Sequence, residues 1–77
     1  MTNHVEYLKE LGANIKRLRL KKGMTQTQLG LNCDFERGNM RRIEAGRTSP
    51  TLKTLIKIAD ALEIEPYQLL KIKRTIK

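Results

Sequence analysis

The sequence of 77 residues is long enough for a single small domain, residues 1–77, and its apolar content of 39% favours a folded chain. Sixteen Lys and Arg residues against eight Asp and Glu give a formal net charge of +8. A domain this small leaves little room for a deep active-site cleft. Its positive charge indicates an anionic partner, with nucleic acid the first candidate and an anionic membrane the second.

The cysteine, histidine and targeting features exclude several other classes of protein. Cys33 is the only cysteine, so no intrachain disulfide forms, and His4 has no second ligand at metal-binding spacing. The sequence has no catalytic constellation and no Gly-rich phosphate loop, so we predict no enzymatic activity, no metal and no cofactor. It also lacks a signal-peptide core and any apolar run near the roughly 20 residues that span a bilayer. We expect a cytoplasmic protein without membrane contact.

The first predicted element is an amphipathic helix over about residues 5–22. Its apolar residues recur every three or four positions, at Leu8, Leu11, Ile15 and Leu18. Asn3 is placed to cap its first turn, and Gly23 follows two lysines at its end.

Two short helices follow, with a turn of about four residues between them. The first, about 25–32, starts with a capping-box pattern in which Gln28 follows Thr25 by three residues. The second, about 36–45, has three apolar residues on its buried side, namely Phe35, Met40 and Ile43. Residues 25–45 therefore have the outline of a helix-turn-helix.

The last two predicted helices follow a polar loop that ends at Pro50. Thr51 is placed to cap the fourth helix. Its expected apolar stripe consists of Leu52, Leu55, Ile56, Ala59 and Leu62. Pro66 suits the first position of a fifth helix that covers Tyr67 to about Leu70. No alternating strand pattern occurs, so the predicted fold class is all-α with five helices.

The exposed face of the third helix carries concentrated positive charge. Because its apolar residues must face the core, the opposite face is expected to hold Gly38, Arg41, Arg42 and Ala45, with Arg37 and Asn39 beside them. The planar fork of arginine suits guanine, asparagine suits adenine, and small residues allow close approach to base pairs. We interpret this face as one that reads DNA, and the alternative is a solvated basic face.

The remaining charge is concentrated as well. Residues 16–22, 37–47 and 71–77 together carry +12, whereas the rest of the chain carries −4. Basic side chains outside the third helix suit contacts to phosphates, which set affinity without reading sequence.

Three stretches of the sequence resemble the Cro/C1-type, or xenobiotic-response-element, helix-turn-helix family. They are residues 24–29 (MTQTQL), 42–46 (RIEAG) and 49–55 (SPTLKTL). The resemblance runs from about residue 14 to 70 and implies a lambda-repressor-like domain that binds double-stranded DNA as a dimer. In this family the third helix enters the major groove, and a dimer reads half-sites about 34–36 Å apart. Restriction-modification controllers, Cro-like phage regulators and repressors of small mobile elements share this format.

The resemblance also implies a role for individual residues. It places nearest the base edges Glu36, Arg37, Gly38, Arg41 and Arg42. It gives phosphate contacts to Thr25, Gln26, Asn39, Arg47 and Thr48. It pairs Arg19 with Glu44, which would hold the third helix against the first and keep the charge of Glu44 away from the phosphates. The alternative partner for Glu44 is Arg41, three residues earlier.

Four positions depart from the family pattern. Gly30 stands where alanine is usual, keeping a close helix contact but lowering helix propensity by up to about 1 kcal/mol. Asp34 replaces the usual turn glycine, and aspartate tolerates a left-handed backbone. Glu36 brings an acid close to DNA, and Gly38 occupies a base-reading position without a side chain. Specificity therefore depends on the three arginines and on DNA shape.

The end of the chain carries more apolar residues than a short last helix needs. We interpret residues 64–77 as a candidate dimerisation segment, with an interface formed by Ile64, Leu69, Leu70 and Ile72. The alternative is that Leu69 and Leu70 cover the core of the monomer.

The sequence thus predicts a DNA-binding transcriptional regulator that acts as a homodimer on a palindromic operator. No ligand-binding domain is visible, so we expect no small-molecule effector. One alternative is an antitoxin that binds a toxin and regulates its own transcription. Another is a nonspecific nucleic-acid-binding protein, which would show a steep salt dependence without a preferred sequence.

Overall fold

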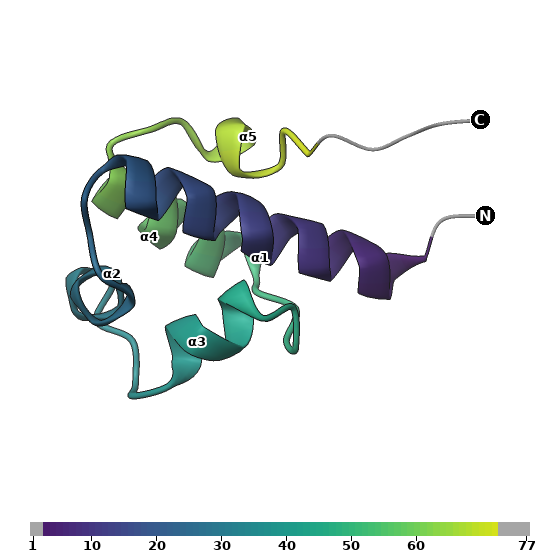
Figure 1. Ribbon diagram of the computed structural model, residues 1–77, viewed down its shortest axis with the longest axis horizontal. Helices are drawn as coiled ribbons and strands as arrows, with labels where there is room; N and C mark the ends of the chain where they lie inside the picture. Colours follow the sequence, from purple (N-terminus) through teal and green to yellow (C-terminus); the bar gives the residue numbers. More distant parts are fainter. Residues whose placement is uncertain (1–2, 73–77) are drawn as a thin grey trace.

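The computed structural model describes residues 3–72 and forms five helices over them, with no strand in that range (Figure 1). They are α1 (His4–Lys21), α2 (Gln26–Asn32), α3 (Asn39–Glu44), α4 (Leu52–Leu62) and α5 (Pro66–Leu69). The all-α prediction is confirmed. Residues 73–77, which include part of the candidate dimerisation segment and of the last basic segment, lie outside the described residues.

At three of the predicted helix starts, the expected capping residue makes a capping hydrogen bond. The Asn3 side chain accepts a hydrogen bond from the backbone N–H of Val5, and that of Thr51 accepts one from Thr54. Thr25 and Gln28 form both hydrogen bonds of a capping box at the start of α2. Local sequence therefore fixes where these three helices begin.

The predicted start of the third helix, at residue 36, is wrong by three positions. Gly38 adopts a left-handed conformation with φ of 82° and precedes the first helical residue, Asn39. The backbone N–H of Asn39 donates to the carbonyl oxygen of Glu36, which closes a tight turn over residues 36–39. Because a left-handed residue cannot lie inside an α-helix, Glu36, Arg37 and Gly38 belong to the turn that enters α3.

The core forms where α1, α2, α3, α4 and α5 meet, and the buried sides of α1 and α3 are largely as predicted. Met40 and Ile43 of α3 are buried, and Phe35 packs partly buried beside them in the turn. On α4, however, two residues of the expected stripe are exposed, Leu52 by 67% and Ile56 by 41%. The buried face of α4 consists instead of Leu55, Ile58, Ala59 and Leu62.

A glycine that the sequence gave no reason to single out brings α1 against the end of α3. A Cβ added at Gly12 would lie 2.5 Å from the carbonyl oxygen of Ile43 and closer still to that of Glu44. Neither backbone atom can move far, because each belongs to the last turn of α3. Gly12 therefore sets the distance between the two helices. By contrast, a Cβ at Gly30 would lie 3.6 Å from Met40, an ordinary contact, so that helix pair does not require glycine.

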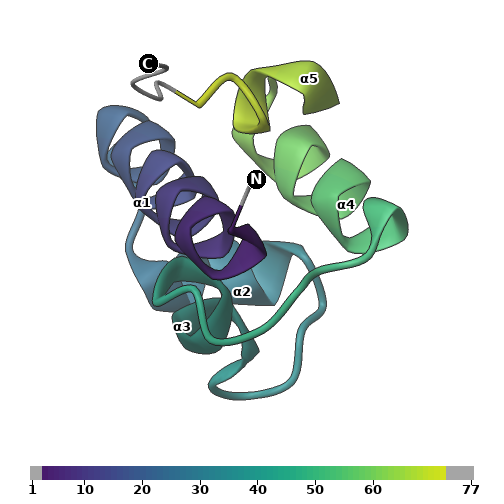
Figure 2. The ribbon, with the colours of Figure 1, turned by 90° about the vertical axis from the view of Figure 1, so that its right-hand side faces the viewer.

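In Figure 1, α5 lies above α1 and α3 lies below it, and Figure 2 shows that α5 lies over α4. The side-chain amide of Asn14 on α1 holds α5 by donating to the carbonyl oxygens of Gln68 and Leu69, at 3.0 and 2.9 Å. Of the helices within residues 3–72, none has the length and apolar character needed to cross a membrane.

Candidate DNA-binding surface

The outer face of α3 presents two arginines to solvent while its inner face is locked into the core. Arg41 and Arg42 are exposed, whereas Met40 and Ile43 retain only 3% and 2% of their accessible surface. The guanidinium of Arg42 lies over the start of α3, with Nη2 3.5 Å from Oδ1 of Asn39. The helix is therefore anchored on one side and carries unburied positive charge on the other.

The turn before α3 adds a third exposed arginine to this surface. Arg37 and Glu36 are exposed residues of the turn rather than of the helix. A Cβ at Gly38 would lie 3.5 Å from Nη1 of Arg42, so space does not demand glycine there. The left-handed backbone at this position requires glycine, so Gly38 stabilises the turn that sets the direction of α3.

A buried ion pair fixes the other end of α3. Nε and Nη2 of Arg19 on α1 donate to Oε2 and Oε1 of Glu44, at 2.7 and 3.0 Å, as the resemblance implied. Nη1 of Arg19 donates to the carbonyl oxygen of Met24 at 2.9 Å. Both charged side chains are almost fully buried, so they neutralise each other inside the fold. Glu44 thus pairs with Arg19 rather than with Arg41.

Gln26 joins this pair, which the sequence did not predict. Its Nε2 donates to Oε1 of Glu44 at 3.0 Å, so the first residue of α2 is tied to the last residue of α3. The contact joins residues 18 positions apart, and only the fold brings them together. The remaining residues expected at phosphates surround the ends of α2 and α3. Thr25 caps α2, Asn39 is the first residue of α3, and Arg47 and Thr48 lie in the loop after α3; all keep exposed surface.

The structure divides the four residues expected at a dimer interface. Leu69 is fully buried and belongs to the monomer core, so the prediction that it contacts a partner is wrong. The side-chain amide of Asn14 also donates to the carbonyl oxygen of Leu69, which ties this residue to α1. Ile64 and Ile72 are partly buried against the core, and Leu70 is 53% exposed.

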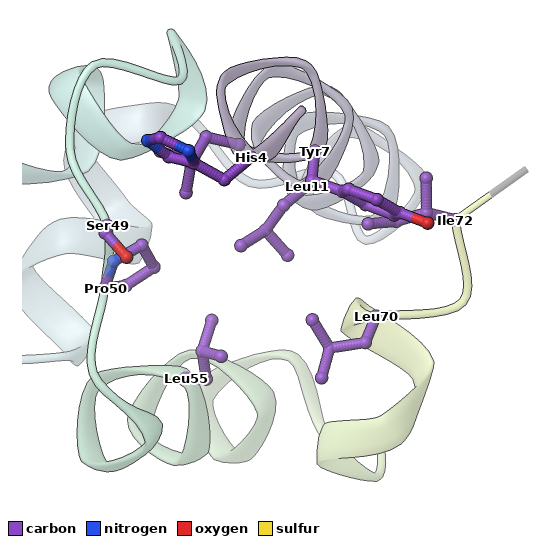
Figure 3. Close-up of a pocket in the computed structure, with 9 residues that line it drawn as sticks. His4, Tyr7, Leu11, Ser49, Pro50, Leu55, Leu70 and Ile72 are labelled. Carbon is purple, nitrogen blue, oxygen red and sulfur yellow. The ribbon is translucent and has the colours of Figure 1, made fainter. Parts of the chain in front are cut away.

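An apolar cavity of about 330 Å³ lies beside Leu70 (Figure 3). Leu11 of α1 and Leu55 of α4 point into it together with Leu70 (Figure 3). Its wall is completed by His4, Tyr7, Leu8, Ser49, Pro50 and Ile72. The cavity holds no cluster of charges and lies between α1, α4 and the segment after α5.

Cys33 is buried in the core. The Cys33 thiol is 3% exposed and donates to the carbonyl oxygen of Lys57 at 3.6 Å, and burial raises the pKa of the thiol to about 11. It stays protonated at neutral pH and acts as a small buried hydrophobe. Among residues 3–72, no group of three His, Cys, Asp or Glu side chains is arranged to hold a metal ion.

Together these features define a class of protein. A capped α2, a tight turn and an α3 that is locked on one face and arginine-rich on the other form a DNA-binding helix-turn-helix. The chain belongs to the helix-turn-helix family HTH_3, whose family model matches residues 15–69, and is a Cro/C1-type transcriptional regulator.

Similar proteins are regulators and controller proteins. The chain is 35% identical over 71 residues to control protein C.BamHI of Bacillus amyloliquefaciens, covering 91% of this chain and 85% of that protein. It is 36% identical over 61 residues to the uncharacterised HTH-type transcriptional regulator y4dJ of Sinorhizobium fredii, with 79% of each chain covered. The crystal structure of the restriction-modification controller protein C.AhdI from Aeromonas hydrophila matches with a TM-score of 0.78 and 32% identity, covering 80% of this chain and 94% of that chain.

Proposed function

We propose that this regulator binds a palindromic DNA operator as a homodimer and reads its bases with Arg37, Arg41 and Arg42. The observation that carries the proposal is the fixed, two-sided α3. Its buried residues and the Arg19–Glu44 pair leave it one orientation, and its arginines face outward. Arginine can bind O6 and N7 of guanine through two parallel hydrogen bonds, so guanines are the expected targets.

Phosphate contacts flank the arginine-rich face. We assign them to Thr25, Gln26, Asn39, Arg47 and Thr48, which lie at the starts of α2 and α3 and in the loop after α3. The Thr25 hydroxyl accepts from the backbone of Gln28 and still has its hydrogen to donate to a phosphate oxygen. These contacts set affinity and register and are independent of sequence.

Glu36 and Gly38 have different roles in this proposal. Glu36 is exposed beside Arg37 and can accept from a cytosine amine, whereas a phosphate there would be repelled. Gly38 reads no base through a side chain. It shapes the turn and lets the backbone at the start of α3 come close to the groove.

The homodimer is proposed to form through exposed apolar residues at α5. Tyr67 and Leu70 are 67% and 53% exposed, and their spacing of three residues puts them on one side of the short helix and its cap. Because α5 lies above α1 and α3 lies below it in Figure 1, contact through α5 leaves α3 uncovered. A two-fold dimer matches a two-fold operator.

A control function in a restriction-modification system is the biological setting that the relatives favour. One relative is a control protein and one structural neighbour is a restriction-modification controller protein. The antitoxin alternative gains no support from the relatives named above. We propose control by protein concentration and cooperative operator binding, with no catalytic step.

The proposal is tested by comparing the DNA sites that variant proteins select from a random pool. Arg42→Ala and Arg37→Ala should each relax base preference at one operator position, at a cost of about 1–3 kcal/mol. Lys53→Ala, a change of equal charge on the exposed surface of α4, serves as the control and should select the wild-type sites. Equal weakening on all sequences would instead assign the two arginines to phosphates.

A further inference from the structure

The side-chain amide of Gln26 has two N–H groups, and the fold provides a hydrogen-bond acceptor for one of them. Nε2 donates to Oε1 of Glu44 at 3.0 Å. A carboxylate only accepts, so the amide nitrogen and not its carbonyl oxygen must face Glu44, which fixes the orientation of the group. The second N–H has no acceptor among residues 3–72, and the Gln26 side chain is only partly buried. The first hydrogen bond therefore fixes the direction of this second donor, on a residue that keeps part of its exposed surface.

The acceptor that orients Gln26 is itself buried and hydrogen-bonded. Glu44 is 9% exposed and accepts two hydrogen bonds from Arg19. Arg19 donates a third hydrogen bond to the carbonyl oxygen of Met24. The series of bonds thus runs from the turn after α1 through Arg19 and Glu44 to α2. Because Arg19 neutralises the carboxylate, Glu44 can lie next to a phosphate-binding side chain without repelling the phosphate.

We propose that Glu44 is a positioning residue for DNA binding, and that it holds one amide hydrogen of Gln26 so that the other meets a backbone phosphate. The inference rests on the proposed function, in which Gln26 contacts phosphate. A free glutamine would lose rotamer freedom on contact with DNA, whereas a held one has already lost it on folding. Loss of this preorganisation should weaken DNA binding by about threefold to tenfold.

A double-mutant cycle on DNA affinity tests the proposal. Glu44→Asp keeps the negative charge beside Arg19 but withdraws the carboxylate by one methylene, about 1.5 Å, so it cannot satisfy both partners. Gln26→Ala removes the phosphate donor. We expect each single variant to bind operator DNA threefold to tenfold more weakly, and the double variant to bind no more weakly than Gln26→Ala alone.

The control is Thr27→Ala, an exposed change one residue along α2, which should bind like wild type. An equal loss from Glu44→Asp in the presence and in the absence of Gln26 would overturn the positioning role and leave the proposed function intact. A Gln26→Ala variant with wild-type affinity and salt dependence would show that the proposed phosphate contact itself is wrong, and the positioning role would be overturned with it.

A second measurement on the wild-type chain covers the case in which Glu44→Asp fails to fold. NMR relaxation of the Gln26 side-chain amide should report an order parameter close to that of the rigid backbone, about 0.85, in the absence of DNA. The exposed Gln28 amide, held only by the cap of α2, is the internal reference. An order parameter for Gln26 below about 0.6 would overturn the proposal.

Discussion

Replacing Arg19 by methionine tests the buried ion pair that fixes α3. Methionine keeps the helix propensity and much of the apolar stem, so the change isolates the guanidinium. The variant loses two hydrogen bonds to Glu44 and one to Met24, and leaves the Glu44 carboxylate in a site that is 9% exposed. Removing one partner of such a pair costs about 3–5 kcal/mol, because a buried charge remains without compensation.

That loss is large for a chain of this size. At about 0.05–0.15 kcal/mol per residue the whole domain is stable by about 4–12 kcal/mol. For a domain of this length, each kcal/mol shifts the melting temperature by about 4–8 °C, so we expect Arg19→Met to melt about 10–40 °C below wild type. Thermal unfolding followed by circular dichroism gives the value.

Two further variants define what the result means. Lys16→Met removes the same charge from an exposed position of α1 and should melt within a few degrees of wild type. Arg19→Met combined with Glu44→Met replaces the whole pair by apolar side chains and should recover much of the lost stability. A single Arg19→Met variant that melts like Lys16→Met would refute the reasoning, since the pair would then carry no stability.

Three other predictions concern the glycines, the buried thiol and the dimer surface. Gly12→Ala should lower the free energy of unfolding by several kcal/mol and weaken DNA binding, because its Cβ meets the α3 backbone. Gly30→Ala should instead raise the free energy of unfolding by about 0.5–1 kcal/mol. Urea unfolding measures both values, and equal shifts in the two variants would contradict the prediction. The Cys33 thiol should react slowly with iodoacetamide at pH 8 in the folded chain. Because its pKa is raised from 9.0 to about 11, the unfolded state loses that proton first, so stability should fall as the pH rises from 9 to 11 and Cys33→Ala should remove this fall. Leu70→Asp should weaken self-association in sedimentation, and Leu31→Asp, which changes an exposed leucine of α2, should not; equal effects of the two would exclude α5 as the interface.

The fold was predictable because its signals are local. The spacing of apolar residues in α1, the Thr25–Gln28 capping box and the proline at the start of α5 each act over one or two helical turns. The predicted start of α3 differs from the observed one because a glycine fits either a helix face or a left-handed turn, and the sequence alone does not distinguish them. On α4, Leu52 and Ile56 fit the helical period but are exposed, because the period does not show how far around the helix the core extends.

The site was predictable in its residue types and less so in its contacts. Arg19 and Glu44 were expected to pair only because of a family resemblance, since charges 25 positions apart give no local signal. The hydrogen bond from Gln26 to Glu44 and the packing of Gly12 on the end of α3 depend on how α1, α2 and α3 meet, and no sequence pattern specifies either. The sequence leaves Leu69 open to an interface or to the core, because apolar character alone does not distinguish the two, and the structure buries it in the core.

Selection of bound sites from a random pool of duplex DNA tests the central claim most directly. The claim is that a fixed α3 reads sequence and that two copies read it with two-fold symmetry. We predict an enriched palindrome whose half-sites lie about 10 base pairs apart, or a multiple of that, with guanines opposite the arginine-rich face. Retention of all sequences alike, with affinity that falls steeply with salt, would contradict the claim and leave only the positive charge as the basis of binding.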